Sequence, residues 1–162
     1  MQAAVDRSDY APLIAELRAR LGEGLRCVVL FGSRARGRGK AGSDHDLLVV
    51  ADRLPSDPVR RRRVLAEALL PVLDRVPGPI GFVGKTTEEL DRNLTALLLD
   101  AAIDGVCLEG NGFFEPYRKA AREALCRSGM RRERVGRAWM WVFPGSPPKD
   151  WELSWKGYRE RA

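Results

Sequence analysis

Short apolar runs alternate with longer amphipathic stretches along most of this chain. Short apolar runs bounded by glycine, proline or polar residues are typical of strands, whereas apolar positions that repeat every three or four residues are typical of helices. The expected strands are 25–31, 47–50, 80–83 and 106–108. The expected helices are 9–21, 59–76, 86–104 and 113–127. Because the two kinds of element alternate, we predict an α/β or α+β fold with helices packed on a small sheet.

Local signals predict where the helices begin and break. Asp9 is a candidate cap for the first helix. Pro71 should break the second helix near Leu70, because proline cannot donate the helical hydrogen bond. Thr86 followed three residues later by Glu89 is a capping box, which predicts that a helix begins there and continues to about residue 104.

The chain changes character after residue 129. All four tryptophans lie in residues 130–162, among prolines and arginines. The alternation of aromatic residues from Trp139 to Phe143 predicts a strand. The aromatics either pack on the domain or on a partner, or form a platform that stacks a base of a nucleotide or RNA. We predict a main domain at 1–129 and a basic, Trp-rich extension at 130–162.

The candidate chemistry starts with two aspartates at the entrance to the second strand. Residues two apart on a strand point the same way, so Asp44 and Asp46 should share a face while His45 points to the other. Two like charges about 6–7 Å apart repel each other unless a cation lies between them. Mg²⁺ binds through one or two carboxylates plus phosphate oxygens, so this pair is a candidate metal site.

A glycine-rich basic loop precedes the two aspartates. Gly32 ends the first strand, and the backbone N–H groups that follow at Ser33 can cradle an anion. Arg34 and Arg36 add positive charge around this turn. The turn and the carboxylates together predict a site for a triphosphate with its metal.

This pair of motifs resembles a known signature. Gly32-Ser33, ten intervening residues and then Asp44-x-Asp46 are similar to the signature of the polymerase-β-like nucleotidyltransferase superfamily, above all of its small members, the minimal nucleotidyltransferases (MNT). The flanking FGSRARG and SDHDLLVV also fit, as do PIGFVGKTTEEL and DGVCLEG downstream, so the likeness runs from about Cys27 to Gly110. The alternative is a glycine-rich turn followed by an ordinary strand.

The resemblance implies a fold, a chemistry and a set of residues. The fold would be a mixed sheet of three to five strands in which the Gly-Ser end of one strand lies beside the Asp-x-Asp strand. Asp44, Asp46 and Ser33 would form the catalytic set, with Mg²⁺ or Mn²⁺ on the two aspartates and ATP as the nucleotide donor. The residues that would hold and neutralise the phosphates are Gly32, Ser33, Arg34 and Arg36.

The family also uses a third carboxylate, on a later strand, which helps to hold a metal and activates the attacking hydroxyl. In this chain the matching position falls on Gly81. No acidic residue occupies the same place on that strand, so nucleotide binding is better supported than turnover.

Composition narrows the class of partner. The net charge is +6 and the pI about 9.6, a balance that favours nucleotides, RNA or an acidic protein surface. We expect no membrane span, since no apolar run reaches about 18 residues, and no secretory signal at the N-terminus. The three cysteines Cys27, Cys107 and Cys126 show no metal-binding spacing and suit reduced thiols, so we expect a cytoplasmic protein.

Three hypotheses from different classes follow. The first is a metal-dependent nucleotidyltransferase that moves a nucleoside monophosphate, AMP from ATP foremost, to a hydroxyl on a protein, RNA or small molecule. In the related minimal enzymes a HEPN-type toxin is often the acceptor, within a toxin–antitoxin pair. The second is a degenerate module that binds nucleotide or a partner without catalysis, favoured by Gly81. The third is an RNA-binding protein acting through residues 130–162, which leaves the aspartate pair unexplained.

Overall fold

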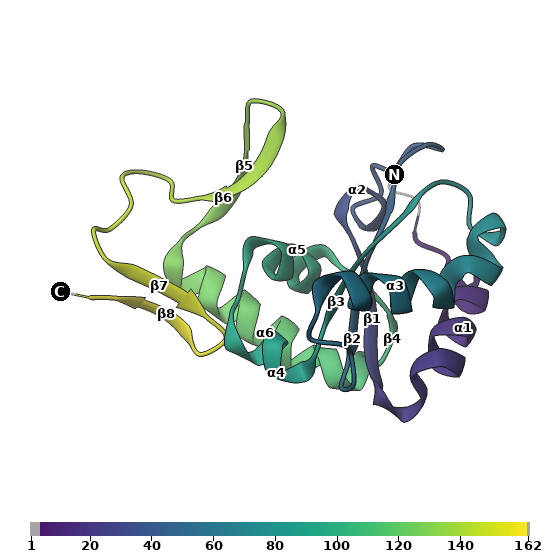
Figure 1. Cartoon of the computed structure of the whole chain (residues 1–162). Coiled ribbons are helices and arrows are strands. Elements are labelled where there is room, and N and C mark those ends of the chain that lie inside the picture. The colour runs from purple at the N-terminus through teal and green to yellow at the C-terminus, as the bar shows by residue number, and fades with distance from the viewer. Residues whose placement is uncertain (1–3, 162) are drawn as a thin grey trace.

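One four-stranded mixed sheet lies at the centre of the computed structural model, which describes residues 4–161 (Figure 1). The strand order is β3-β2-β1-β4, so β3 and β4 are the two edges. β1 runs antiparallel to both β2 and β4, whereas β2 and β3 run parallel. The strands of this sheet are β1 (Leu25–Phe31), β2 (His45–Ala51), β3 (Ile80–Lys85) and β4 (Val106–Glu109).

Helices cover both faces of the sheet. They are α1 (Ala11–Leu21), α2 (Gly32–Ala35), α3 (Pro58–Leu69), α4 (Thr87–Arg92), α5 (Ala96–Asp104) and α6 (Asn111–Ser128), with the 3₁₀ turns η1 (Arg7–Tyr10), η2 (Gly22–Gly24) and η3 (Leu70–Arg75). α1 and α3 pack on one face, where Leu30, Leu47 and Leu65 are fully buried. α4, α5 and α6 pack on the other, around Leu48 and Phe114. The predicted mixed α/β class is confirmed.

Two β-hairpins extend the chain beyond α6 (Figure 1). The first pairs β5 (Arg131–Val135) with β6 (Ala138–Val142), and the second pairs β7 (Trp151–Ser154) with β8 (Gly157–Glu160). The predicted strand at the tryptophan alternation is therefore present as β6. Trp155 donates a 2.6 Å hydrogen bond to the carbonyl of Leu90 in α4, so the second hairpin also contacts the sheet-packing helices.

Two helix predictions need correction. The cap predicted at Asp9 is wrong. Asp9 lies within η1, which the side chain of Asp6 caps by accepting from the backbone N–H of Ser8, and α1 begins only at Ala11 with no side-chain cap. The stretch 86–104 is two helices rather than one. Asn93 is extended (φ −142°, ψ 137°), and the Thr95 side chain accepts from the backbone N–H of Leu98 to cap the second helix.

Other local signals are confirmed. The capping box is complete, since the side chains of Thr86 and Glu89 each bond to the other's backbone N–H. The α-helix α3 ends at Leu69, and Pro71 lies in the 3₁₀ turn that follows. The second and third strands are longer than predicted, because their edges carry polar residues and glycines that an apolar run does not include.

The cysteines and the apolar character of the helices complete the description of the chain. Cys27 and Cys107 are buried and Cys126 is exposed, and all three are free thiols. Among residues 4–161, no helix has both the length and the apolar character needed to cross a bilayer.

Candidate active site

The two aspartates lie at the start of β2, beside the end of β1. Asp44 is exposed and directly precedes the strand, and Asp46 is half-buried on it. Asp46 pairs with Phe31 of β1 on one side and with Gly81 of β3 on the other. The sheet therefore places Asp46 between the glycine turn and the strand on which a third acid was expected.

Gly32 lies close to the carboxylate of Asp46. Its φ is +77°, a left-handed conformation that favours glycine, and it opens the short helix α2. A Cβ at this position would lie 2.6 Å from Oδ2 of Asp46. Only a residue without a side chain lets the turn come this close, so the glycine is required by both its backbone conformation and its contact. Ser33 follows on α2 and is half-buried, with its backbone N–H in the first turn of that helix.

The electrostatics of the site favour a cation at Asp46. Burial raises the pKa of the Asp46 carboxyl, and the neighbouring charge of Asp44 raises it further, while the Arg36 guanidinium opposes this shift. A carboxylate whose charged form is disfavoured by burial and by a like charge is stabilised by a bound divalent metal. Two carboxylates in this setting fit Mg²⁺ that is completed by phosphate oxygens and water.

One nitrogen of the Arg36 guanidinium has no hydrogen-bond partner among the described residues. That nitrogen is Nε, and it is buried. Unpaired buried donors are costly, and they commonly mark a place where a ligand or water completes the structure. Arg36 therefore combines nearness to Asp46 with an unsatisfied donor, as expected of a side chain that contacts phosphate.

Arg34 is placed differently. Its guanidinium donates to three backbone carbonyls, those of Ser43 at 2.9 Å and of Ala41 and Pro77 at 3.2 Å each. It ties the basic loop to the segment before β3. These bonds use the guanidinium that we expected on a phosphate, so in this structure Arg34 braces the loop rather than facing the aspartates.

His45 braces the same segment from the other face of β2. Its ring is 3% exposed, Nε2 lies 2.5 Å from the carbonyl oxygen of Pro77, and Nδ1 lies 2.8 Å from the hydroxyl of Tyr10. A carbonyl can only accept, so Nε2 donates and Nδ1 accepts from the tyrosine. His45 faces away from Asp46, as the strand alternation predicted, and holds the entrance of β2 against that of β3.

The position on β3 where a third carboxylate was expected is occupied by Gly81. It pairs directly with Asp46, and a Cβ added to it would meet only Oδ1 of Asp46, at 3.1 Å. Within residues 4–161, no group of three or more Asp, Glu, His or Cys side chains is arranged to hold a metal. No other acidic residue of the described chain replaces the missing one.

The C-terminal extension reaches the basic loop, which sequence reasoning did not predict. The Trp139 ring lies 5.3 Å from the guanidinium carbon of Arg38. Arg132 pairs with Asp100 at 2.6 Å and with Asp104, both on α5. A hollow of about 390 Å³ lies between the hairpin and α2, with Arg36 and Arg38 on one wall and Arg132 on the other. The two walls come from residues about a hundred positions apart, which no local pattern reveals.

A carboxylate against a glycine turn of the neighbouring strand, with a second carboxylate two residues before it and a mixed sheet backed by helices, defines a nucleotidyltransferase-type protein. Residues 13–93, half of the chain, match the family model described as Nucleotidyltransferase domain, and the chain belongs to this family. The resemblance predicted from the two motifs is thus confirmed.

Individual relatives cover parts of the chain. A Methanocaldococcus jannaschii protein, provisionally named a protein adenylyltransferase, is 37% identical over 62 residues, which are 38% of this chain and 42% of that protein. The chain thus matches about two fifths of the length of this curated relative.

Solved structures of toxin–antitoxin systems are also similar. A chain of a toxin–antitoxin complex with AMP-PNP is 21% identical with a TM-score of 0.47, over 77% of this chain and 94% of that one. A chain from a complex of tri-AMPylated Shewanella oneidensis HEPN toxin with MNT antitoxin is 20% identical with a TM-score of 0.40, over 78% and 95%.

Proposed function

We propose that this protein transfers AMP from ATP to a hydroxyl group on a protein. The observation that carries the proposal is the position of Asp46, which lies in contact with the Gly32 turn while Asp44 adjoins it. This arrangement supports a carboxylate pair that binds the metal and a turn that binds phosphate. The family supplies the reaction class, and the name of the archaeal relative supports a protein acceptor.

Each residue has a role that follows from its place. Asp44 and Asp46 would hold Mg²⁺, which neutralises charge on the triphosphate when bound. The backbone N–H groups at Gly32 and Ser33 bind phosphate oxygens, and Ser33 adds its hydroxyl. Arg36 places its guanidinium on the phosphates and satisfies its unpartnered Nε there.

The proposed reaction is an in-line displacement at phosphorus. The acceptor hydroxyl oxygen forms a bond to the α-phosphorus, and the bond from that phosphorus to the bridging oxygen of pyrophosphate breaks. The hydroxyl proton passes to water. The products are the AMP ester of the acceptor and pyrophosphate.

The test separates nucleotide binding from transfer. The protein is incubated with Mg²⁺, a set of synthetic tyrosine- and serine-containing peptides, and ATP labelled at either the α- or the γ-phosphate. We expect α-label but no γ-label on a peptide, with stoichiometric pyrophosphate. Asp44→Asn and Asp46→Asn should both abolish transfer, whereas Asp74→Asn, an exposed aspartate in η3, should leave it unchanged. Transfer that survives both active-site changes would refute the proposal.

One observation favours a second candidate, a nucleotide-binding module without catalysis. Gly81 leaves Asp46 with no acidic neighbour on β3. This alternative predicts that calorimetry detects tight binding of Mg²⁺-ATP that depends on Asp44 and Asp46, while no peptide or protein acceptor takes the α-label. A HEPN-type protein is the first full-length acceptor to try, as the resemblance implies.

A further inference from the structure

The side from which the acceptor approaches follows from the two oxygens of Asp46. Oδ2 faces the Gly32 turn and Oδ1 faces Gly81, as the two close Cβ positions show. In an in-line displacement the attacking and leaving oxygens lie on opposite sides of the phosphorus. If the leaving pyrophosphate lies over Gly32 and Ser33, as the proposed function requires, the attacking hydroxyl comes from the side of Gly81.

Gly81 lies on an edge strand. β3 pairs only with β2, so its other side has no strand partner. The carbonyl of Pro79 accepts from the N–H of His45 in β2, so odd-numbered residues of β3 turn their backbone groups toward β2 and even-numbered residues turn theirs outward. The outward groups are those of Ile80, Phe82 and Gly84. Among residues 4–161, only the carbonyl of Gly84 meets a partner there, Nη1 of Arg61 at 3.1 Å.

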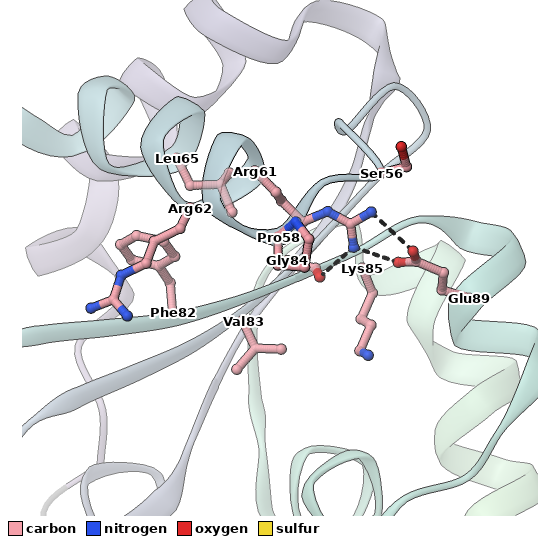
Figure 2. Close-up of a pocket in the computed structure, with 10 residues that line it drawn as sticks. All are labelled: Ser56, Pro58, Arg61, Arg62, Leu65, Phe82, Val83, Gly84, Lys85 and Glu89. Atoms are coloured by element: carbon pink, nitrogen blue, oxygen red, sulfur yellow. Dashed lines mark hydrogen bonds and ion pairs between the residues drawn. The ribbon is translucent and has the colours of Figure 1, made fainter.

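A groove of about 400 Å³ follows this edge away from Gly81 (Figure 2). Phe82 and Leu65 supply its apolar surface, and Val83 and Lys85 point to the opposite side of the strand from Arg61. Four residues of strand span about 13 Å, so the groove continues the line of the edge from Gly81 to Lys85. An extended chain lying on the edge would therefore contact both Gly81 and the groove.

The groove is rigid on one side and positively charged. Arg61 bonds both carboxylate oxygens of Glu89, at 2.6 and 2.9 Å, and its Nε donates to the carbonyl of Pro55 at 2.8 Å. Its charge is therefore compensated. Arg62 and Lys85 also line the groove, and neither forms an ion pair within the described part of the chain. The two unpaired cations favour an acidic occupant.

We propose that the acceptor is an extended, acidic polypeptide segment that adds to β3 as a further strand and presents a tyrosine over Gly81. The inference rests on the proposed function and names its acceptor. Outward backbone groups supply the ladder, as in other cases of strand addition, and Arg62 and Lys85 select acidic residues along the groove.

Reach favours tyrosine over serine. A residue opposite Gly81 on an added strand lies about 9.5 Å from the Cα of Asp46, two strand spacings away. A tyrosine hydroxyl extends about 6 Å from its own Cα, whereas a serine hydroxyl extends about 2 Å. Side chains opposite Gly81 project to the same face as Asp46, and Gly81 itself leaves the path across that face open.

The probe is a nine-residue peptide with a central tyrosine, small apolar residues beside it and two glutamates at each end. Its symmetry makes the result independent of strand direction. Four companion peptides test its parts. One has serine at the centre and one has lysines in place of the glutamates. Two are N-methylated at alternate residues, the first on the edge that carries the tyrosine's N–H and the second on the opposite edge. Transfer is measured with α-labelled ATP, and hydrogen exchange of β3 is measured with and without peptide.

We expect the parent peptide to be labelled and to slow exchange at the outward amides of Ile80, Phe82 and Gly84. One N-methylation pattern should abolish both effects and the other should not, because only one edge of the peptide faces β3. Arg62→Glu combined with Lys85→Glu should raise the KM for the peptide about tenfold or more, with kcat and ATP affinity unchanged. Arg60→Glu is the control for charge reversal: it reverses one charge on α3 outside the groove and should leave the KM unchanged.

The outcomes separate the two proposals. If Mg²⁺-ATP does not bind, the proposed function fails. If it binds, and the peptide neither slows exchange at β3 nor takes label, strand addition is overturned while nucleotidyl transfer can still stand on another acceptor. Three other results would also overturn the inference. Both N-methylation patterns could reduce labelling equally, or charge reversal at Arg62 and Lys85 could leave the KM unchanged. A single-stranded oligonucleotide could also protect β3 from exchange in place of the peptide.

Discussion

Replacing Glu89 with glutamine tests the ion pair between Arg61 and Glu89, which forms one wall of the groove on β3. The change removes the charge that Arg61 contacts through two bonds, while the glutamine oxygen can still accept from the N–H of Thr86 in the capping box. The hydrogen bonds from Arg61 lower the pKa of Glu89 from 4.5 to about 2. The variant therefore isolates the ion pair from the helix cap.

The magnitude follows from the pKa shift. A drop from 4.5 to about 2 is about 2.5 units, and at 1.36 kcal/mol per unit it corresponds to an upper limit of about 3.4 kcal/mol. The Glu89 side chain is 31% exposed and that of Arg61 13%, so solvent screens part of this interaction. We expect Glu89→Gln to lower the free energy of unfolding by about 1.5–2 kcal/mol at pH 7.

The pH dependence has a defined sign. The folded-state pKa of Glu89 lies below the unfolded value, so its contribution is fully present above about pH 4.5 and is lost as the pH falls toward 2. Urea unfolding of both proteins, followed by tryptophan fluorescence from pH 2 to 7, should give free energies of unfolding that differ at neutral pH and approach each other as the pH falls to 2. A difference that stays constant over this range would refute the assignment.

Glu88→Gln is the matched control for this experiment. Glu88 is the neighbouring residue on α4 and pairs with Arg92, but its side chain is 84% exposed. An exposed pair of this kind contributes at most about 0.5 kcal/mol. A loss for Glu88→Gln as large as that for Glu89→Gln would mean that the effect comes from the helix dipole rather than from the contact with Arg61.

Three further substitutions test the site and the extension. Gly81→Asp adds a third carboxylate beside Asp46, so it should lower the Tm without metal and increase the rise in Tm caused by Mg²⁺. Gly81→Asn adds no charge and should have neither effect. Thermal unfolding at several Mg²⁺ concentrations measures both. Gly32→Ala forces a side chain into a left-handed conformation and against Asp46, so it should cost about 1–2 kcal/mol in urea unfolding and weaken Mg²⁺-ATP binding in calorimetry. Arg132→Gln removes the half-buried ion pairs to α5, so it should destabilise the protein by about 2 kcal/mol and speed hydrogen exchange in the first hairpin. The side chain of Arg131 is 62% exposed, so Arg131→Gln should cause neither change.

The sequence predicted the parts of the fold that depend on local patterns. The strands, the capping box and the break at Pro71 follow from periodicity, caps and proline chemistry. The undivided helix from 86 to 104 was wrong because its leucine spacing continues across Asn93. Thr95, a favourable N-cap residue three positions before Leu98, was the signal for the second start.

Long-range contacts could not be predicted in the same way. The spacing between Gly32 and Asp46 identified a turn and a carboxylate that meet in the structure. Arg34 was expected on phosphate, yet its bonds reach Pro77, more than forty positions away. Nothing local distinguishes an arginine that braces a loop from one that meets a ligand, because both need only a flexible cation near a turn. The contact of Trp139 with Arg38 likewise depends on how the hairpin folds back.

The absence of an acid at position 81 changes what kind of acceptor suits this site. A carboxylate there would face Oδ1 of Asp46 and could take the proton from an incoming hydroxyl. Without it, the acceptor in the proposed transfer must supply more of its own acidity, and a phenol with a pKa near 10 ionises far more readily than an aliphatic alcohol. The same glycine removes the side chain that would stand between the edge of β3 and Asp46. The loss of a general base and the opening of a path for a long, more acidic side chain are therefore two consequences of one residue, and both favour tyrosine.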